Sequence, residues 1–237
     1  MTARTLLITR PRAESEALAQ TLAAEGWASI AEPLLEIKAL PEELPDLSRF
    51  RALVFTSVQA VAVFAGKSRR RDLPVYAVGL ATEAAARKTG FGDIRTAAGN
   101  VAALNRLLAE ERPGDQRSLL HICGVHIADH VRAPGTAVER LVLYDARAAT
   151  ELSFSCLDAL DRKLIYGVLF FSPRTGKIFA GLLEKYARTE AVSSIFALCL
   201  SDTVLESIRH LPWRDVQAAA APDTAGMMAL LKGMDSK

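Results

Sequence analysis

Residues 52–66 read ALVFTSVQAVAVFAG, and residues 167–181 read GVLFFSPRTGKIFAG. Each stretch begins with a short apolar run, passes through a serine, and continues into a longer run that closes on Phe-Ala-Gly. The first part is typical of a buried strand, and the second part is typical of a helix that the serine precedes. The offset from Ser57 to Ser172 is 115 residues, so a strand–turn–helix unit occurs twice in this chain.

Three further pairs of segments repeat at similar offsets. The segment 75–78 matches 195–198, residues 100–101 match 223–224, and residues 4–7 match 117–120. The offsets drift slowly, as small loop insertions would make them do. The first unit contains two matches, 55–57 with 170–172 and 64–66 with 179–181, so five matches in the same order predict two structurally similar halves.

Strand and helix patterns alternate along the whole chain. Strands are expected at 5–9, 29–34, 52–56, 74–78, 93–96, 117–123, 141–144, 167–171, 195–200 and 216–220. Helices are expected at 13–25, 58–66, 82–88, 101–111, 155–160, 174–187, 203–210 and 224–231, with Asn100 as the N-cap of the fourth. This alternation predicts an α/β fold with parallel sheets flanked by helices.

The composition excludes several classes of protein. The chain has 237 residues, of which 50% are hydrophobic and 24% charged, with a net charge of +2. Disordered proteins and proteins that coat polyanions are therefore excluded, and the basic run 67–71 is interpreted as a solvated helix end. No run reaches the length of a membrane span, and residues 1–12 do not resemble a signal peptide. Three widely spaced cysteines predict neither disulfides nor a metal site, and they fit a reducing, cytoplasmic setting.

Hydroxyl side chains follow several of the expected strands. Thr56, Ser57, Thr82, Ser172 and Ser201 all lie at strand-to-helix turns, where open α/β sheets bind ligands. Free N–H groups at helix starts bind carboxylates or phosphates, so a cleft between two such halves suits a polyanionic ligand. The alternative is that these residues only cap helices.

Motifs for cofactors are absent from the sequence. It contains no Gly-x-Gly-x-x-Gly, no Walker-type loop and no Gly-x-Ser-x-Gly. His126 and His130 are four residues apart, but no third ligand accompanies them, so all four histidines are interpreted as structural or solvated. We expect neither a metal nor an organic cofactor.

The ordered motifs resemble the uroporphyrinogen-III synthase family over nearly the whole chain. They are ITRP at 8–11, FTS at 55–57, VYAVG at 75–79, AT at 81–82, VLY at 142–144 and FFSP at 170–173. The resemblance implies two similar α/β lobes joined by a two-stranded connector near 34–37 and 142–148. Lobe one would be 1–34 plus 149–237, and lobe two would be 35–148.

The resemblance also implies a reaction. Members of this family are lyases that close the linear tetrapyrrole hydroxymethylbilane with inversion of ring D, in the pathway to haem and related tetrapyrroles, without a cofactor. Tyr144 matches the tyrosine of the connector strand and is the candidate that hydrogen-bonds the leaving hydroxyl. Arg10 and Arg174, with the five hydroxyl residues, are candidates that bind the substrate's carboxylates.

Some segments depart from the pattern of the family. The chain has Cys199-Leu200-Ser201 where many relatives have Gly-Pro-Thr or Gly-Pro-Ser, and residues 124–128 read GVHIA rather than carrying an arginine-rich helix start. Val58-Gln59 replaces a common Pro-Arg. The alternative hypothesis is therefore a catalytically degenerate two-lobed protein that binds an anionic small molecule such as a tetrapyrrole. We expect a cytoplasmic monomer that binds no nucleic acid and no membrane, and that contacts the upstream hydroxymethylbilane synthase transiently.

Overall fold

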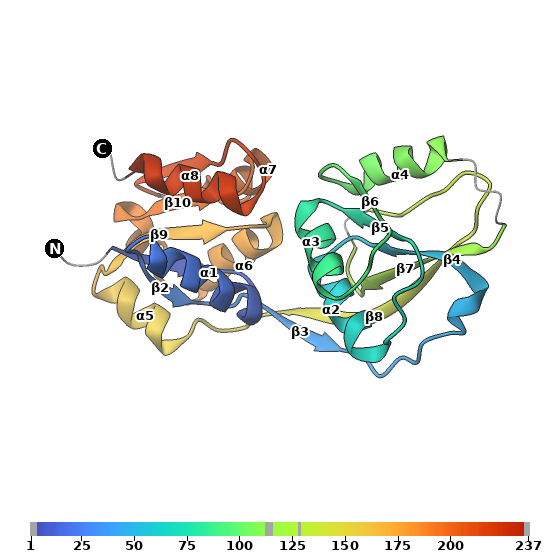
Figure 1. Cartoon of the computed structure of the whole chain (residues 1–237). Helices are drawn as coiled ribbons and strands as arrows, with labels where there is room; N and C mark the ends of the chain where they lie inside the picture. The colour runs from blue at the N-terminus through green and yellow to red at the C-terminus, as the bar shows by residue number, and fades with distance from the viewer. Residues whose placement is uncertain (1–3, 112–115, 128, 235–237) are drawn as a thin grey trace. The chain divides into compact units, whose positions relative to one another are not determined.

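The computed structural model describes residues 4–111, 116–127 and 129–234, and the chain divides into two compact units (Figure 1). Unit 1 consists of Met1–Glu36 and Arg147–Lys237, and unit 2 consists of Ile37–Ala146. Each unit contains one sheet with its own hydrophobic core. The expected α/β fold with two parallel sheets flanked by helices is confirmed.

The sheet of unit 1 has five parallel strands in the order β11-β10-β9-β1-β2. They are β1 (Thr5–Ile8), β2 (Ala28–Ala31), β9 (Ile165–Phe170), β10 (Phe196–Cys199) and β11 (Asp215–Ala218). The three central strands are buried on both faces, which explains their nearly continuous apolar sequences. Because the strands are parallel, all of them end at the same edge of the sheet, which we call the carboxyl edge of unit 1.

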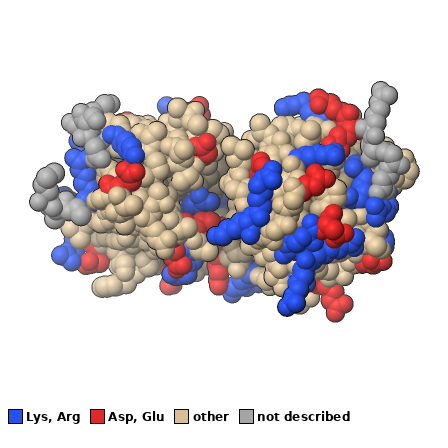
Figure 2. All heavy atoms as spheres, viewed as in Figure 1, with Lys and Arg blue, Asp and Glu red and all other residues tan. Residues whose placement is uncertain are grey.

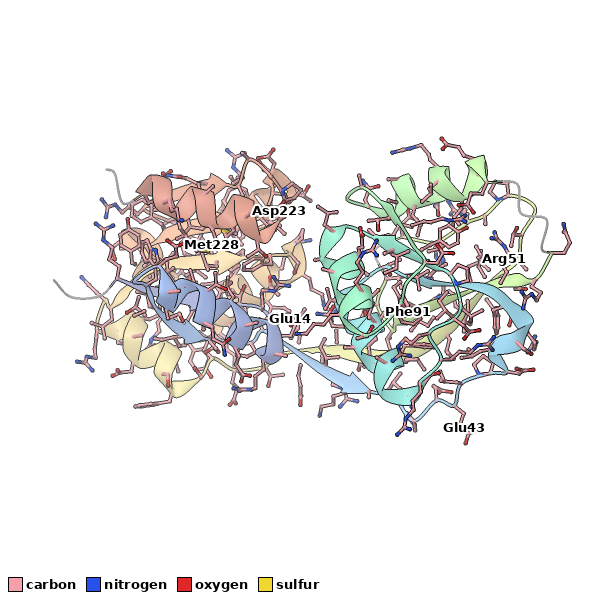
Figure 3. The ribbon with its side chains drawn as sticks, viewed as in Figure 1. Glu14, Glu43, Arg51, Phe91, Asp223 and Met228 are labelled. Carbon is pink, nitrogen blue, oxygen red and sulfur yellow. The ribbon has the colours of Figure 1, made fainter. Side chains whose placement is uncertain are left out.

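Helices cover both faces of this sheet. Helices α1 (Arg12–Ala24) and α8 (Thr224–Met234) pack on one face through a cluster that includes Leu22 and Met227. The helices α5 (Phe154–Asp161), α6 (Pro173–Lys185) and α7 (Asp202–Glu206) and the 3₁₀ helix η2 (Thr189–Ser194) contribute to the cluster on the other face. Figure 3 labels Met228 on α8 and Glu14 on α1.

The sheet of unit 2 has six strands in the order β3-β8-β7-β4-β5-β6, and the last five pair in parallel. The strands are β3 (Leu35–Ala39), β4 (Phe50–Phe55), β5 (Val75–Val78), β6 (Ile94–Ala97), β7 (Ser118–Gly124) and β8 (Val138–Ala148). The carboxyl edge of unit 2 is the edge at which strands β4, β5 and β7 end. Strand β3 hydrogen-bonds β8, and just beyond it the Leu40 N–H donates to the Leu143 carbonyl at 2.8 Å.

Among the described residues of unit 2, three α-helices flank this sheet. Helices α2 (Val58–Lys67) and α3 (Leu80–Lys88) contribute Phe64 and Ala86 to the core on one face, whereas α4 (Val101–Glu110) contributes Leu104 to the core on the other. A 3₁₀ helix, η1 (Leu47–Arg49), precedes β4. Asn100 caps α4 as the sequence predicts, because its side chain accepts from the Ala103 N–H at 2.9 Å.

The expected helix 203–210 is wrong in length. Helix α7 ends at Glu206, and the following turns are closed by short-range bonds such as Ile208 N–H to the Leu205 carbonyl at 3.1 Å. The Ser207 hydroxyl also donates to the Val204 carbonyl at 2.6 Å, so this backbone carbonyl accepts a hydrogen bond from a side chain. Strand β3 is a second difference, because the sequence pattern gives no strand there apart from the family resemblance.

Charges of both signs are interspersed on the visible surface of each unit (Figure 2). The basic run 67–71 makes structural contacts. Arg71 donates to the carbonyls of Thr89 and Ser68, and its guanidinium lies 4.9 Å from the centre of the Phe91 ring, which Figure 3 labels. Within the described parts of the chain, no helix is both long enough and apolar enough to span a bilayer.

Candidate functional site

The carboxyl edge of unit 2 carries four of the expected site residues. Thr56 and Ser57 follow β4, Thr82 lies in the first turn of the helix after β5, and Tyr144 lies on β8. Between β4 and β8 in the sheet lies β7, which ends at Gly124. Adjacent strands of one sheet thus place these residues along a single edge.

Tyr144 and Ser57 are in direct contact. The Tyr144 hydroxyl lies 2.9 Å from Ser57 Oγ, and Tyr144 is 8% exposed. Ser57 also caps α2, because its Oγ accepts from the Ala60 N–H at 3.1 Å. Ser57 therefore has a structural role and contacts the candidate catalytic hydroxyl at the same time.

A register shift in the sheet determines where Tyr144 lies. Cys123 pairs with Val142 but Gly124 pairs with Tyr144, so β8 contains one residue more than β7 at this point. A bulge of this kind redirects the side chains that follow it. The Tyr144 ring lies against Gly124 so closely that a Cβ on Gly124 would be 2.7 Å from Cε2 and 2.8 Å from Cζ.

Thr56 points to the opposite face of the sheet from Ser57. Its Oγ1 lies 3.3 Å from Nε2 of His121, a histidine on β7 that is 1% exposed. In register, His121 pairs with Val54, whose side chain belongs to the core on the α4 face. Thr56 is two residues beyond Val54 and so continues the same face.

The start of helix α3 lacks a side-chain cap. Its N-cap is Gly79, with φ of +79°, a conformation that favours glycine. The first N–H groups of the helix are thus left for an external acceptor, and helix starts of this kind bind anions. Thr82 in this turn is 4% exposed.

Two apolar side chains are exposed at the same edge. Leu80, the first residue of α3, is 69% exposed, and Val125, just after β7, is 47% exposed. The carboxyl edge of unit 2 therefore combines hydrogen-bond donors with apolar surface, a combination that suits an organic polyanion.

Arg10 is the main charged residue at the carboxyl edge of unit 1. Its guanidinium lies 4.7 Å from the centre of the Phe171 ring, and it interacts electrostatically with the carboxylate of Glu14 on α1. Burial lowers the pKa of Arg10 from its ordinary value of 12.5, and the Glu14 carboxylate opposes this shift. A guanidinium stays protonated in proteins, so Arg10 provides a partly desolvated positive charge.

Ser172 and Arg174 lie at the start of α6. Ser172 Oγ accepts from the Thr175 N–H at 3.2 Å and lies 3.1 Å from Thr175 Oγ1, which donates to the Ser172 carbonyl at 2.9 Å. Because Thr175 has one hydroxyl proton, Ser172 is the donor in the hydroxyl–hydroxyl contact. The Ser172 hydroxyl is thus engaged within the helix cap, whereas Arg174 lies half-buried in the first helical turn.

Ser201 precedes α7 but does not cap it with its side chain. The structure gives the Ser201 hydroxyl no hydrogen-bond partner among the described residues, and the residue is half-buried at the end of β10. In unit 1, strand order thus places Ser201, Ser172 and Arg10 after three adjacent strands, β10, β9 and β1.

Two residues of the site were not selected by sequence reasoning. The sequence pattern indicates only a structural or solvated role for His121, and it marks Gly124 only as part of a segment that departs from relatives. The signal in the sequence was a polar residue inside the apolar run 119–123 and a glycine at its end. Val125, His126 and Ile127 follow Gly124, whereas Ala128 lies outside the described residues.

The cysteines and histidines give no indication of metal chemistry. Among residues 4–111, 116–127 and 129–234, no group of three or more His, Cys, Asp or Glu side chains could hold a metal ion. Cys123, Cys156 and Cys199 are buried free thiols. Burial raises the pKa of Cys199 to about 12 and also raises that of Cys156, so both thiols stay protonated at neutral pH.

We expect His121 to make folding stability depend on pH. Burial, together with the positive charges of Arg140 and His130, lowers the pKa of His121 from 6.5 to about 4. Between these values the unfolded chain binds more protons than the folded one, so this contribution is complete above pH 6.5 and is lost as pH falls toward 4. The loss amounts to about 3 kcal/mol.

Urea unfolding of the wild type and of His121→Leu at pH 7, 5.5 and 4.5 measures this effect. The wild-type advantage over the variant is expected to shrink as the pH falls. An advantage of the same size at all three values would show that His121 titrates normally.

Comparisons with known proteins cover nearly the whole chain. The family model described as uroporphyrinogen-III synthase HemD matches residues 16–229. A search of curated proteins returns no match. Among solved structures, a mutant uroporphyrinogen III synthase from Thermus thermophilus is similar with a TM-score of 0.58 and 15% identity, over 99% of this chain and 98% of that one. A wild-type structure of the Thermus thermophilus enzyme has a TM-score of 0.43 and 16% identity, over 99% and 97% of the two chains.

Proposed function

This chain belongs to the uroporphyrinogen-III synthase family, and we propose that it converts hydroxymethylbilane into uroporphyrinogen III and water through the Tyr144 hydroxyl. The observation that carries this mechanism is the contact of 2.9 Å between that hydroxyl and Ser57 at the carboxyl edge of unit 2. The fold of the chain is that of the family, since its two α/β units resemble a solved uroporphyrinogen III synthase over 99% of this chain.

Tyr144 assists the departure of the terminal hydroxyl group of the substrate. Ser57 Oγ contacts the Tyr144 hydroxyl and holds it in place, and Tyr144 donates its proton to the leaving hydroxyl. The carbon–oxygen bond breaks, water leaves, and the substrate becomes a cationic azafulvene. Ring D then attacks this cation through a carbon atom, and the spiro intermediate fragments and closes again with ring D inverted. The final closure releases one proton from the substrate, which balances the proton that Tyr144 gave to the departing water.

Both the nucleophile and the electrophile of this reaction belong to the substrate. The protein therefore needs to supply a proton donor and a shape that brings the two ends of the chain together. On this chemical ground we propose that the reaction requires no metal ion and no organic cofactor.

Unit 2 binds carboxylates and pyrrole rings of the substrate. Thr56 provides a hydroxyl at the end of β4, and the first turn of α3, with Thr82, provides backbone N–H groups that no side chain caps. Leu80 and Val125 provide apolar contacts for pyrrole rings. Hydrogen bonds from neutral and backbone groups to a carboxylate are charge-assisted and correspondingly strong.

Unit 1 binds further carboxylates. Arg10 carries the positive charge, held over the Phe171 ring, and Arg174 adds a second one from the first turn of α6. The Ser201 hydroxyl is a donor just after the end of β10, and Ser172 caps the start of α6.

The setting of the enzyme follows from its substrate. Hydroxymethylbilane cyclises spontaneously to the I isomer, so we propose that this protein acts in the cytoplasm beside hydroxymethylbilane synthase and contacts it transiently, on the route to haem. We further propose that the protein is a monomer and binds neither nucleic acid nor membranes, in line with its mixed surface charge (Figure 2).

An isomer assay tests the function. Hydroxymethylbilane is generated in place, incubated with and without the protein, and oxidised, and the uroporphyrin isomers are then separated. The expected product is dominated by the III isomer. A product dominated by the I isomer, from protein shown to be folded, would overturn the proposal.

A further inference from the structure

We infer that His121 is a positioning residue for substrate binding, because its Nε2–H holds the oxygen of Thr56 and so directs the Thr56 proton toward a substrate carboxylate. This inference rests on the proposed function, which makes Thr56 a substrate ligand. It adds a buried residue that does not itself touch the substrate.

The geometry of the pair is defined by the sheet. His121 on β7 lies opposite Val54 on β4, and Thr56 lies two residues beyond Val54 on the same face. The contact of 3.3 Å joins Nε2 to Oγ1, and the His121 side chain is almost completely buried. His121 thus contacts Thr56 from within the sheet, where its burial keeps it from touching a ligand.

The other ring nitrogen decides which atom carries the proton. Nδ1 of His121 is buried and has no hydrogen-bond partner among the described residues. A buried N–H without a partner is rarer in proteins than a buried acceptor without one. The proton of the neutral ring therefore belongs on Nε2, where it can be donated to Thr56 Oγ1.

The ring is neutral at working pH. Burial lowers the pKa of His121 to about 4, and the positive charge of Arg140 acts in the same direction. In the neutral Nε2–H form, the ring donates one hydrogen bond, which Thr56 Oγ1 accepts. The Thr56 hydroxyl has no other partner among the described residues, so its own proton remains for a ligand.

Nitrogen-15 NMR of the imidazole in the wild-type protein tests the tautomer directly, without any activity. The expected spectrum at pH 7 is that of the Nε2–H form. A spectrum of the Nδ1–H form would overturn the inference, because Thr56 would then have to donate its proton to Nε2.

Steady-state kinetics test the consequence. His121→Leu is expected to raise KM for hydroxymethylbilane about fivefold, the effect of one hydrogen bond, with kcat changed by less than about twofold. His121→Gln keeps an N–H donor and is expected to restore KM, which a purely structural role would not explain. In the Thr56→Val background, His121→Leu is expected to add little. The exposed His210→Gln serves as the control.

The outcomes separate this inference from the proposed function. A wild type that forms the III isomer, with additive effects of His121→Leu and Thr56→Val on KM, overturns the positioning role alone. If the wild type forms only the I isomer, the function fails, and the same variants are compared by titration with uroporphyrinogen III. Equal affinities of wild type and His121→Leu would then overturn the inference. If His121→Leu does not fold, the NMR spectrum of the wild-type imidazole and the KM of His121→Gln still test the inference.

Discussion

Tyr144→Phe is expected to lower kcat for the formation of uroporphyrinogen III about 100-fold, which is at the lower end of the range for loss of a general acid. The substitution removes the hydroxyl that lies 2.9 Å from Ser57 Oγ and leaves the ring, which packs in the core of unit 2, in place. The bond to the leaving hydroxyl forms as that group departs, so its loss raises the barrier of the reaction more than it weakens binding. KM and the affinity for uroporphyrinogen III are expected to change by less than about threefold.

The matched control is Tyr166→Phe. Tyr166 lies in β9 of unit 1, contacts Trp27 and Phe196 through its ring, and makes no hydrogen bond to a described residue through its hydroxyl. This control is expected to retain wild-type kcat. A Tyr144→Phe enzyme with more than half of the wild-type kcat would exclude Tyr144 as the proton donor.

Gly124→Ala is expected to have a comparable effect on activity through the same tyrosine. The added methyl group would lie 2.7 Å from Cε2 and 2.8 Å from Cζ of Tyr144, well inside van der Waals contact, so the ring has to move. Movement of the ring breaks the bond to Ser57 and displaces the reacting hydroxyl, and a displacement of about 1 Å can cost about 100-fold in rate. Overpacking of this kind also lowers the free energy of unfolding by about 1–3 kcal/mol.

Gly66→Ala provides the control within the same unit. Gly66 lies in α2, and a Cβ at this position would meet no atom within 4 Å. This variant is expected to keep full activity and to be slightly more stable, because alanine favours helix more than glycine does. Kinetics and urea unfolding of both variants give the comparison. A Gly124→Ala enzyme with wild-type kcat would show that the ring can move without consequence.

The alternation of strands and helices and the class of fold could be predicted from the sequence. In parallel strands such as 52–56 and 167–171 the burial of both faces produces an apolar run, and the residue that ends the run marks the edge of the sheet. The sequence of each strand marks where that strand ends. The sequence therefore predicts separately, for each strand, which hydroxyl residues follow it at the edge of the sheet: Thr56, Ser57, Thr82, Ser172 and Ser201. The end of the helix expected at 203–210 could not be predicted, since the chain after Glu206 continues in turns closed by short-range bonds such as Ile208 N–H to the Leu205 carbonyl.

Local patterns by themselves determined that hydroxyl residues follow the strands of two repeated α/β units, because periodicity and helix capping depend on neighbours in the chain. Only the tertiary structure decided which other side chains these hydroxyl groups contact. Ser172 gives its proton to Thr175, Ser57 contacts Tyr144 from 87 residues away, and Thr56 contacts His121 from 65 residues away. The physical reason is that these bonds depend on strand order and register, including the extra residue of β8, and a one-residue change of register would point each side chain to the other face of the sheet.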